Sequence, residues 1–112
     1  MSKRGLIVLT PFPYSDLSEA KVRPAVVIAE HSASEDFVVA FISTNTERTD
    51  PMDVLIKRTD PHFARTGLKS DSVIRVAKLA TLDRRIILGD IGIIDEDHMK
   101  QVKSRLKKLF LI

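Results

Sequence analysis

An arginine at the start of an apolar run is the clearest candidate for chemistry in this sequence. Residues 22–29 read Val-Arg-Pro-Ala-Val-Val-Ile-Ala, so Arg23 is followed by a proline and then by apolar, mostly β-branched residues. Proline fixes its own φ and biases the preceding residue toward extended geometry, which predicts a strand with Arg23 at its rim. A planar, permanently charged guanidinium on a rigid strand is suited to bind a phosphate. The alternative is an ordinary solvated arginine that opens a strand.

Polar residues interrupt the apolar runs in three places that can contribute to one site: residues 15–23, 43–45 and 75–78. If the strands form a barrel, its loops and strand ends would bring together two arginines, hydroxyl groups and a carboxylate. Metal-dependent cleavage has little support, because His31, His62 and His98 are scattered and no acidic cluster has the spacing of metal ligands. The four glycines are isolated, so the sequence also has no glycine-rich phosphate-binding loop.

The composition is that of a small protein with a packed core. The 112 residues are 44% hydrophobic and 29% charged, which predicts one domain over residues 1–112. The absence of cysteine excludes disulfides, thiolate zinc sites and cysteine nucleophiles, and it suits a cytoplasmic location. No stretch approaches the roughly 20 apolar residues of a membrane span, and no secretion signal is expected. The net charge of +3 is only a mild bias toward polyanions.

A series of short strands must position the polar groups. Apolar segments bounded by turn residues predict five or six strands, at residues 5–9, 22–29, 36–42, 52–57, 72–79 and 86–94. Segment 36–42 is almost continuously apolar, as expected of a central strand covered on both faces. Glycines at positions 89 and 92 predict bends in the last strand. Residues 58–69 give conflicting signals that permit a loop with a short helical turn.

The end of the chain changes period and predicts one amphipathic helix. Asp95 is placed to cap it, with Glu96 and Asp97 in the first turn. Its apolar face consists of Met99, Val102, Leu106, Leu109 and Phe110, and its basic face of Lys100, Lys103, Arg105, Lys107 and Lys108. We interpret the basic face as solvated rather than as an RNA-binding surface. The strands and the helix together predict a compact, mainly β barrel with a C-terminal amphipathic helix.

The sequence resembles the MazF/PemK/Kid-like toxins of bacterial type II toxin–antitoxin systems. The resemblance extends over nearly the whole chain and is loosest at residues 45–70. Its most specific parts, in combination, are the Arg-Pro strand, residues 71–76 (Asp-Ser-Val-Ile-Arg-Val) and residues 81–83 (Thr-Leu-Asp). The other matching segments are residues 5–9, 11–13, 18–19 and 40–44 and the closing helix.

The resemblance implies a homodimeric, SH3-like β-barrel that acts as a metal-independent, sequence-specific endoribonuclease with no cofactor. Its substrate would be single-stranded RNA, and its partners a cognate antitoxin and, through their complex, promoter DNA. By position, Arg23 corresponds to the family's catalytic arginine. Ser43 corresponds to its catalytic threonine or serine, with Thr44 as the neighbouring alternative. Arg75 matches an arginine that some members use at the cleavage site, and Glu19 matches an acidic residue before the arginine strand.

Four further polar residues are expected to contact the RNA: Ser18, Lys21, Asn45 and Lys78. The sequence departs from the family pattern in two places. The loop at residues 18–22 lacks the glutamine and glycines often found there. Ala77 stands where some relatives have an aspartate that assists the second arginine, and Asp83, six residues further on, is not expected to replace it.

Two other functions are considered beside the ribonuclease. One is a catalytically silent barrel that binds nucleic acid, most plausibly promoter DNA together with an antitoxin. The other is a protein-binding SH3-like module, against which the single Tyr and the absence of Trp argue. The same scarcity of aromatic residues removes a stacking platform for bases, so single-stranded RNA would be held mainly through phosphates and hydrogen bonds.

Overall fold

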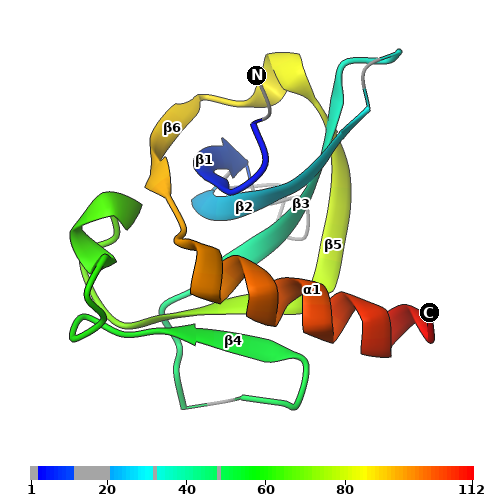
Figure 1. The fold of residues 1–112 in the computed structure, drawn as a ribbon. Coiled ribbons are helices and arrows are strands. Elements are labelled where there is room, and N and C mark those ends of the chain that lie inside the picture. Colours follow the sequence, from blue (N-terminus) through cyan, green and yellow to red (C-terminus); the bar gives the residue numbers. More distant parts are fainter. Residues whose placement is uncertain (1–2, 12–20, 32, 48) are drawn as a thin grey trace.

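The chain forms a bent antiparallel sheet with a helix packed against it (Figure 1). The computed structural model describes residues 3–11, 21–31, 33–47 and 49–112. Its strands are β1 (Leu6–Pro11), β2 (Val22–His31), β3 (Asp36–Ser43), β4 (Asp53–Ile56), β5 (Ser72–Asp83) and β6 (Gly89–Ile93), paired in the order β4-β5-β3-β2-β1-β6. The described helices are α1 (Glu96–Phe110) and the short 3-10 helices η1 (Phe63–Thr66) and η2 (Arg84–Ile86).

β3 is the third strand of the sheet and contributes side chains to two apolar clusters. Ala40 and Ile42 belong to the cluster that includes Val102 of α1, whereas Val39 and Phe41 belong to the cluster on the other face. A strand that is covered on both faces has no position for a solvated side chain in its middle, which explains the nearly continuous apolar run. The prediction of a central strand at residues 36–42 is confirmed.

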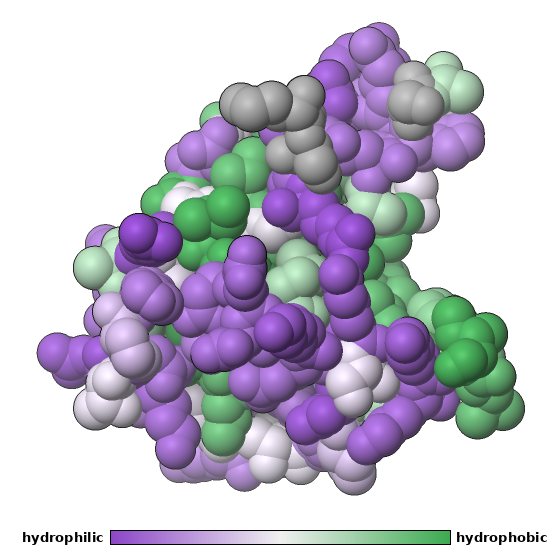
Figure 2. Space-filling model, viewed as in Figure 1, coloured by the Kyte–Doolittle hydropathy of each residue, from purple (hydrophilic) through white to green (hydrophobic). Residues whose placement is uncertain are grey.

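α1 begins where the sequence predicts. The Asp95 carboxylate accepts a hydrogen bond of 2.8 Å from the backbone N–H of His98 and so caps the helix. Val102 is fully buried against the sheet. The predicted apolar face is correct only in its first part, because Leu109 and Phe110 are 36% and 55% exposed. The last turn extends past the sheet (Figure 1), and Figure 2 shows hydrophobic side chains gathered at this end.

The short helix η1 packs against β6, an outer strand of the sheet. Among the described strands, the outer strands β4 and β6 do not pair with each other. A Cβ atom added at Gly67 would lie 2.0 Å from the carbonyl oxygen of Ile91 in β6, and one at Gly92 would lie 2.2 Å from that of Arg65 in η1. The backbones of η1 and β6 are therefore in direct contact, which only glycine permits. The mainly β, barrel-like fold with a C-terminal helix is confirmed.

The end of β5 and the start of β6 differ from the prediction. β5 continues past Leu79 to Asp83, because its second half pairs with the first half of β3. The strand predicted at residues 86–94 begins only at Gly89. The short helix η2 (Arg84–Ile86) takes up Ile86, the first residue of the predicted strand. The Asp83 carboxylate caps η2, because it accepts a hydrogen bond of 2.8 Å from the Arg85 backbone N–H.

The segment at residues 58–69 does contain a short helical turn, η1, as its mixed signals permit. In the part of the chain that the structure describes, no helix is both long and apolar enough to cross a membrane.

Candidate functional site

The pairing register gathers candidate residues on one face of the sheet. Arg75 of β5 lies opposite Phe41 of β3, and Phe41 lies opposite Ala25 of β2. Side chains two residues apart on a strand share a face, so Ser43 lies next to Phe41 and Arg23 next to Ala25 on that face. Groups from three strands therefore meet, although they are far apart in the sequence.

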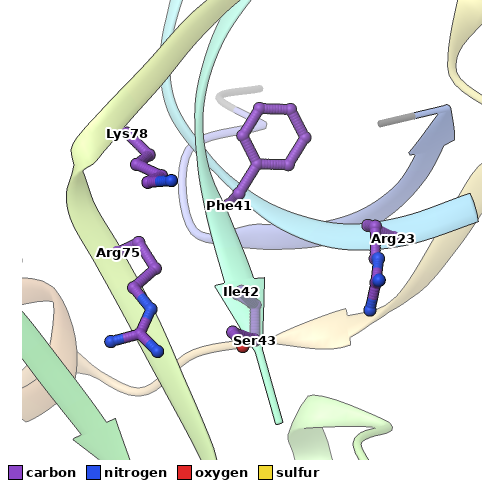
Figure 3. Close-up of a pocket in the computed structure, with 6 residues that line it drawn as sticks. All are labelled: Arg23, Phe41, Ile42, Ser43, Arg75 and Lys78. Atoms are coloured by element: carbon purple, nitrogen blue, oxygen red, sulfur yellow. The ribbon is translucent and has the colours of Figure 1, made fainter. Parts of the chain in front are cut away.

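A pocket of about 240 Å³ opens where they meet (Figure 3). Its lining residues are Arg23, Phe41, Ile42, Ser43, Arg75 and Lys78. Phe41 and Ile42 are buried, whereas the other four residues bring three cationic groups and a hydroxyl to a small volume. Such a set of donors is suited to bind the phosphate of a nucleic acid.

Arg23 is carried by a paired strand, as the sequence predicts. It is the second residue of β2 and lies opposite Thr10 of β1, and Pro24 lies opposite Leu9. Its side chain is half-buried. Because the backbone on which it stands belongs to the sheet, the guanidinium projects from a fixed point rather than from a loop.

The Ser43 hydroxyl has a defined local partner. Its Oγ accepts a hydrogen bond of 3.0 Å from the backbone N–H of Asn45, and Asn45 Oδ1 accepts one of 3.2 Å from the backbone N–H of Glu47. A hydroxyl that accepts through its oxygen keeps its hydrogen for donation. Ser43 can therefore donate toward the pocket while it holds the following turn. Thr44 and Asn45 are exposed and do not line the pocket.

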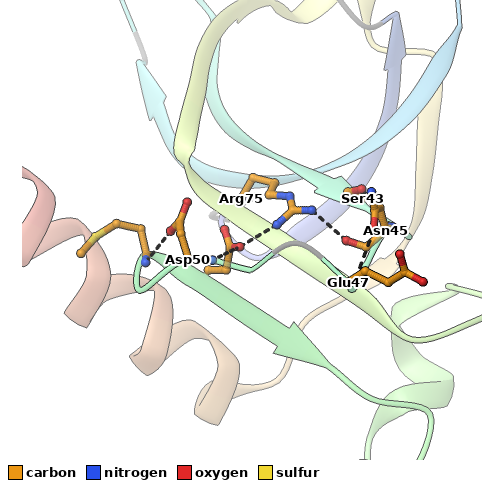
Figure 4. A network of polar contacts seen from close by, with 7 residues as sticks. Ser43, Asn45, Glu47, Asp50 and Arg75 are labelled. Atoms are coloured by element: carbon orange, nitrogen blue, oxygen red, sulfur yellow. Dashed lines mark hydrogen bonds and ion pairs between the residues drawn. The ribbon is translucent and has the colours of Figure 1, made fainter.

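Arg75 is held by two contacts to the protein (Figure 4). Its Nη1 donates to Asp53 Oδ2 at 2.6 Å, and its Nη2 donates to the Asn45 carbonyl oxygen at 2.7 Å. The side chain of Asp53 is 3% exposed and that of Arg75 17% exposed. A short, charge-assisted hydrogen bond in a buried place is among the stronger polar contacts in a protein.

The same carboxylate organises the loop before β4. Asp53 Oδ2 also accepts a hydrogen bond of 2.8 Å from the backbone N–H of Asp50, and Asp50 Oδ1 accepts one of 2.7 Å from that of Met52. Ser43 stands at one end of this loop and Asp53 at the other. Arg75 contacts Asp53 directly and contacts Asn45, the residue whose N–H donates to Ser43 (Figure 4).

Comparison with known proteins now identifies the family. Residues 3–110 match the sequence model of the family described as PemK-like, MazF-like toxin of type II toxin-antitoxin system. The chain belongs to this family. No curated protein matches the toxin's sequence.

Solved structures share the toxin's fold at low sequence identity. MazF of Deinococcus radiodurans is 16% identical, with a TM-score of 0.76 over 99% of this chain and 97% of that one. Mycobacterium tuberculosis toxin MazF-mt6 is 18% identical, with a TM-score of 0.73 over 96% and 97% of the two chains. An endoribonuclease in complex with its cognate antitoxin, from a mycobacterial species, is 17% identical, with a TM-score of 0.73 over 100% and 97%.

The structure shows which carboxylate contacts Arg75 in this toxin, which has Ala77 where some relatives have an aspartate. Ala77 is exposed, and the Arg75 guanidinium is bound instead by Asp53 from the neighbouring strand. Asp83 is occupied elsewhere, because its carboxylate is 2.8 Å from Arg85 Nη2, and hydrogen bonds from Arg85 lower the pKa of Asp83 to about 2. Its carboxylate is thus held by Arg85, at the far end of β5 from Arg75.

Asp53 cannot be recognised as a site residue from the sequence around it. Within residues 52–57 it was one carboxylate in a weakly alternating segment, and nothing local connects it with Arg75. The available signal was indirect, since a carboxylate at the start of a short strand can face an arginine on a paired strand. Only the register, which places Asp53 directly opposite Arg75, shows which arginine it faces.

Of the four residues that are predicted to contact RNA, the structure places one at the pocket. Lys78 lines the pocket, whereas Lys21 is exposed immediately before β2 and Asn45 contributes its backbone carbonyl to Arg75. Ser18 and the acidic candidate Glu19 lie outside the described residues. Among the residues that are described, no group of three or more His, Asp or Glu side chains could hold a metal ion.

Proposed function

We propose that this toxin is a metal-independent endoribonuclease that cleaves single-stranded RNA at specific sequences and leaves a 2′,3′-cyclic phosphate. The pocket carries the proposal, because Arg23, Arg75 and Lys78 line it together with the Ser43 hydroxyl. Membership of the toxin family supports it, as does the fold shared with structures described as endoribonucleases.

In this reaction the nucleophile belongs to the RNA. The ribose 2′-oxygen forms a bond to the adjacent phosphorus while the bond from phosphorus to the 5′-oxygen breaks. The 2′-hydroxyl gives its proton to a base, and the departing 5′-oxygen receives a proton. The protein therefore orients the in-line attack, stabilises negative charge on the phosphoryl oxygens and handles two protons.

The two arginines suit the stabilisation of charge. A guanidinium offers two parallel N–H groups to phosphoryl oxygens and stays protonated near neutral pH, so it is unsuited to accept the 2′ proton. We assign Arg23 to the phosphoryl oxygens and to donation toward the leaving 5′-oxygen. Arg75 supplies a second set of donors from the opposite side of the pocket, across Phe41.

The remaining groups complete the site. Ser43 donates one hydrogen bond to the reacting phosphate, and its exposed neighbour Thr44 is the alternative for this role. Lys78 binds a phosphate at the pocket. We assign removal of the 2′ proton to Glu19, which precedes β2, on the resemblance alone. Ser18, Lys21 and Asn45 would contact the RNA on either side of the cleaved bond.

Cleavage of single-stranded RNA in the presence of a chelator tests the proposal. The purified toxin should produce fragments with 2′,3′-cyclic phosphate ends, and Arg23→Ala should lower kcat by about 10²-fold or more, because it removes donors that stabilise the transition state. Arg85→Ala, which removes an arginine whose side chain is 88% exposed, is the matched control. Intact RNA with retained binding would contradict the proposal and indicate a silent nucleic-acid-binding barrel.

We further propose that a cognate antitoxin binds this toxin, that the toxin is a homodimer, and that it acts in the cytoplasm on single-stranded RNA. The structure that was solved with its cognate antitoxin supports such a partner for a protein of this fold. Light scattering of the purified toxin, alone and with the product of the neighbouring reading frame, measures both assemblies. Binding of promoter DNA would be tested with the toxin–antitoxin complex.

A further inference from the structure

We infer that Asp53 is a positioning residue of this active site, whose buried carboxylate holds Arg75 in the orientation that cleavage needs. The inference rests on the proposed function and deepens it. It assigns a role to a residue that neither the motif at residues 71–76 nor the Arg-Pro strand contains.

The first observation is the burial of the carboxylate beside one cation. Asp53 Oδ2 is 2.6 Å from Arg75 Nη1, and its side chain is 3% exposed. A carboxylate removed from water is stable in its charged form only if it is paired and hydrogen-bonded. Asp53 meets both conditions, since it accepts from Arg75 and from the Asp50 backbone N–H. The pair is therefore a built contact of the folded protein rather than a surface ion pair.

The second observation is that Arg75 is anchored through both terminal nitrogens. Nη1 donates to Asp53 and Nη2 to the Asn45 carbonyl oxygen, so the planar guanidinium is fixed at two points (Figure 4). A long side chain that is ordered before substrate arrives loses less conformational freedom when it binds a phosphate. Preorganised donors are also the ones that stabilise a transition state most effectively.

The third observation is that the contact extends to Ser43. The carbonyl of Asn45 accepts from Arg75, and the N–H of the same residue donates to Ser43 Oγ. Asp53, Arg75, Asn45 and Ser43 thus form a chain of direct contacts from β4 across the sheet to the end of β3. A change at Asp53 should disturb the orientation of two proposed catalytic groups and leave Arg23, which stands on β2, in place.

The charge of Asp53 provides a signature that a general loss of structure would not give. Asp53→Asn keeps the size of the side chain and an oxygen acceptor but removes the negative charge next to Arg75. The pocket then becomes more positive, so RNA should bind as well as before or more tightly. Arg75 is held less firmly, so the chemical step should slow. We expect kcat to fall by about 10²-fold, the order expected from small misplacements of catalytic groups, while KM does not rise.

A double-mutant cycle tests whether Asp53 acts through Arg75. Asp53→Asn, Arg75→Ala and the double variant are compared for kcat and KM on one RNA oligonucleotide. We expect Asp53→Asn to add less than about twofold in the Arg75→Ala background, because residues that act through one another are not additive. Asp83→Asn, which removes a half-exposed carboxylate at the far end of β5, the strand of Arg75, is the matched control and should behave as wild type. An equal loss in both backgrounds, or a raised KM with unchanged kcat, would overturn the inference.

A spectroscopic measurement keeps the inference separate from the proposed function. In ¹⁵N NMR spectra, the Nη groups of Arg75, assigned by their loss in Arg75→Ala, should show restricted rotation in the wild type and faster rotation in Asp53→Asn. An Arg75 that is equally restricted in both proteins would overturn the role of Asp53. Failure of the wild type to cleave RNA would overturn the proposed function instead, and the NMR comparison would still decide whether Asp53 holds Arg75.

Discussion

Individual side chains in the pocket differ in what holds them. Arg23 stands on β2, whereas the Arg75 guanidinium on β5 donates to Asp53 and to the Asn45 carbonyl. Ser43 depends on the turn that follows it, through its contact with the Asn45 N–H. Arg75 and Ser43 therefore share a contact with Asn45, whereas Arg23 stands on a separate strand, and substitutions at the shared and the separate parts should give distinguishable effects.

Substitutions at residues 43 and 44 should decide which hydroxyl serves the reaction. Ser43→Ala removes a donor that lines the pocket, and we expect kcat to fall about tenfold, the value of one hydrogen bond of roughly 1.4 kcal/mol. Thr44→Ala should have an effect of at most about twofold, because Thr44 is exposed and does not line the pocket. Ser43→Thr keeps a hydroxyl and should retain most of the activity. Initial rates on one RNA substrate measure all three, and a larger loss in Thr44→Ala would move the assignment to Thr44.

Among the structural elements, β5 has an irregularity in its pairing with β3 that affects which side chains line the pocket. Leu79 lies opposite Ala40 of β3 while Arg75 lies opposite the next residue, Phe41, so residues 76–78 of β5 have no counterpart on β3. Such an insertion bends a strand and redirects its side chains. It breaks the simple alternation along β5, and Lys78 joins Arg75 at the pocket as a result (Figure 3).

Because Lys78 lines the pocket, we predict that it contacts one phosphate of the RNA, which the salt dependence of binding can detect. Lys78→Ala should weaken RNA binding, and the slope of log affinity against log salt concentration should decrease by about 0.7, the value of one phosphate contact with a single strand. Lys100→Ala is the matched control, because Lys100 is exposed on the basic face of α1, which we interpret as solvated. Binding titrations at several salt concentrations measure both. An unchanged slope in Lys78→Ala, or a reduced one in Lys100→Ala, would contradict this assignment of the two lysines.

At the scale of the whole molecule, a buried histidine connects the helix to the loop after β4. His98 Nδ1 is 2.8 Å from Asp95 Oδ1, and His98 Nε2 is 3.1 Å from Asp60 Oδ2. Burial alone would raise the pKa of Asp95. The hydrogen bond from the His98 backbone N–H, electrostatic interaction with His98 and His62, and the side-chain contact with His98 together outweigh burial and lower the pKa of Asp95.

This lowered pKa predicts how stability depends on pH. A carboxyl group whose pKa is lower in the folded state adds stability above its unfolded value, about 3.9 for aspartate. That contribution is lost as the pH falls through the folded pKa. The free energy of unfolding should therefore decrease as the pH is lowered below about 4, and Asp95→Asn should flatten this part of the curve. Denaturant titrations from pH 7 downward measure the effect, with Asp97→Asn, on the exposed side of the same turn, as control. An unaltered curve in Asp95→Asn would contradict the assignment.

Several parts of this protein were determined by short stretches of sequence. The strand that carries Arg23 follows from a proline and a β-branched run, the central strand from an almost continuously apolar run, and the start of α1 from a capping aspartate followed by helical spacing. Each of these signals acts within a few residues, through backbone dihedrals or local hydrogen bonds, and so can be read without the fold. The resemblance to the toxin family follows from the same segments.

Other features were decided only by the tertiary structure. The pairing of Asp53 with Arg75 depends on the register between β4 and β5, and the place of Lys78 depends on an interruption in the pairing of β5 with β3. The exposure of Leu109 and Phe110 depends on where the sheet beneath α1 ends. These are relations between segments that are distant in the chain. Packing of the whole sheet fixes them, because a shift of one residue in register would turn a different set of side chains toward the pocket.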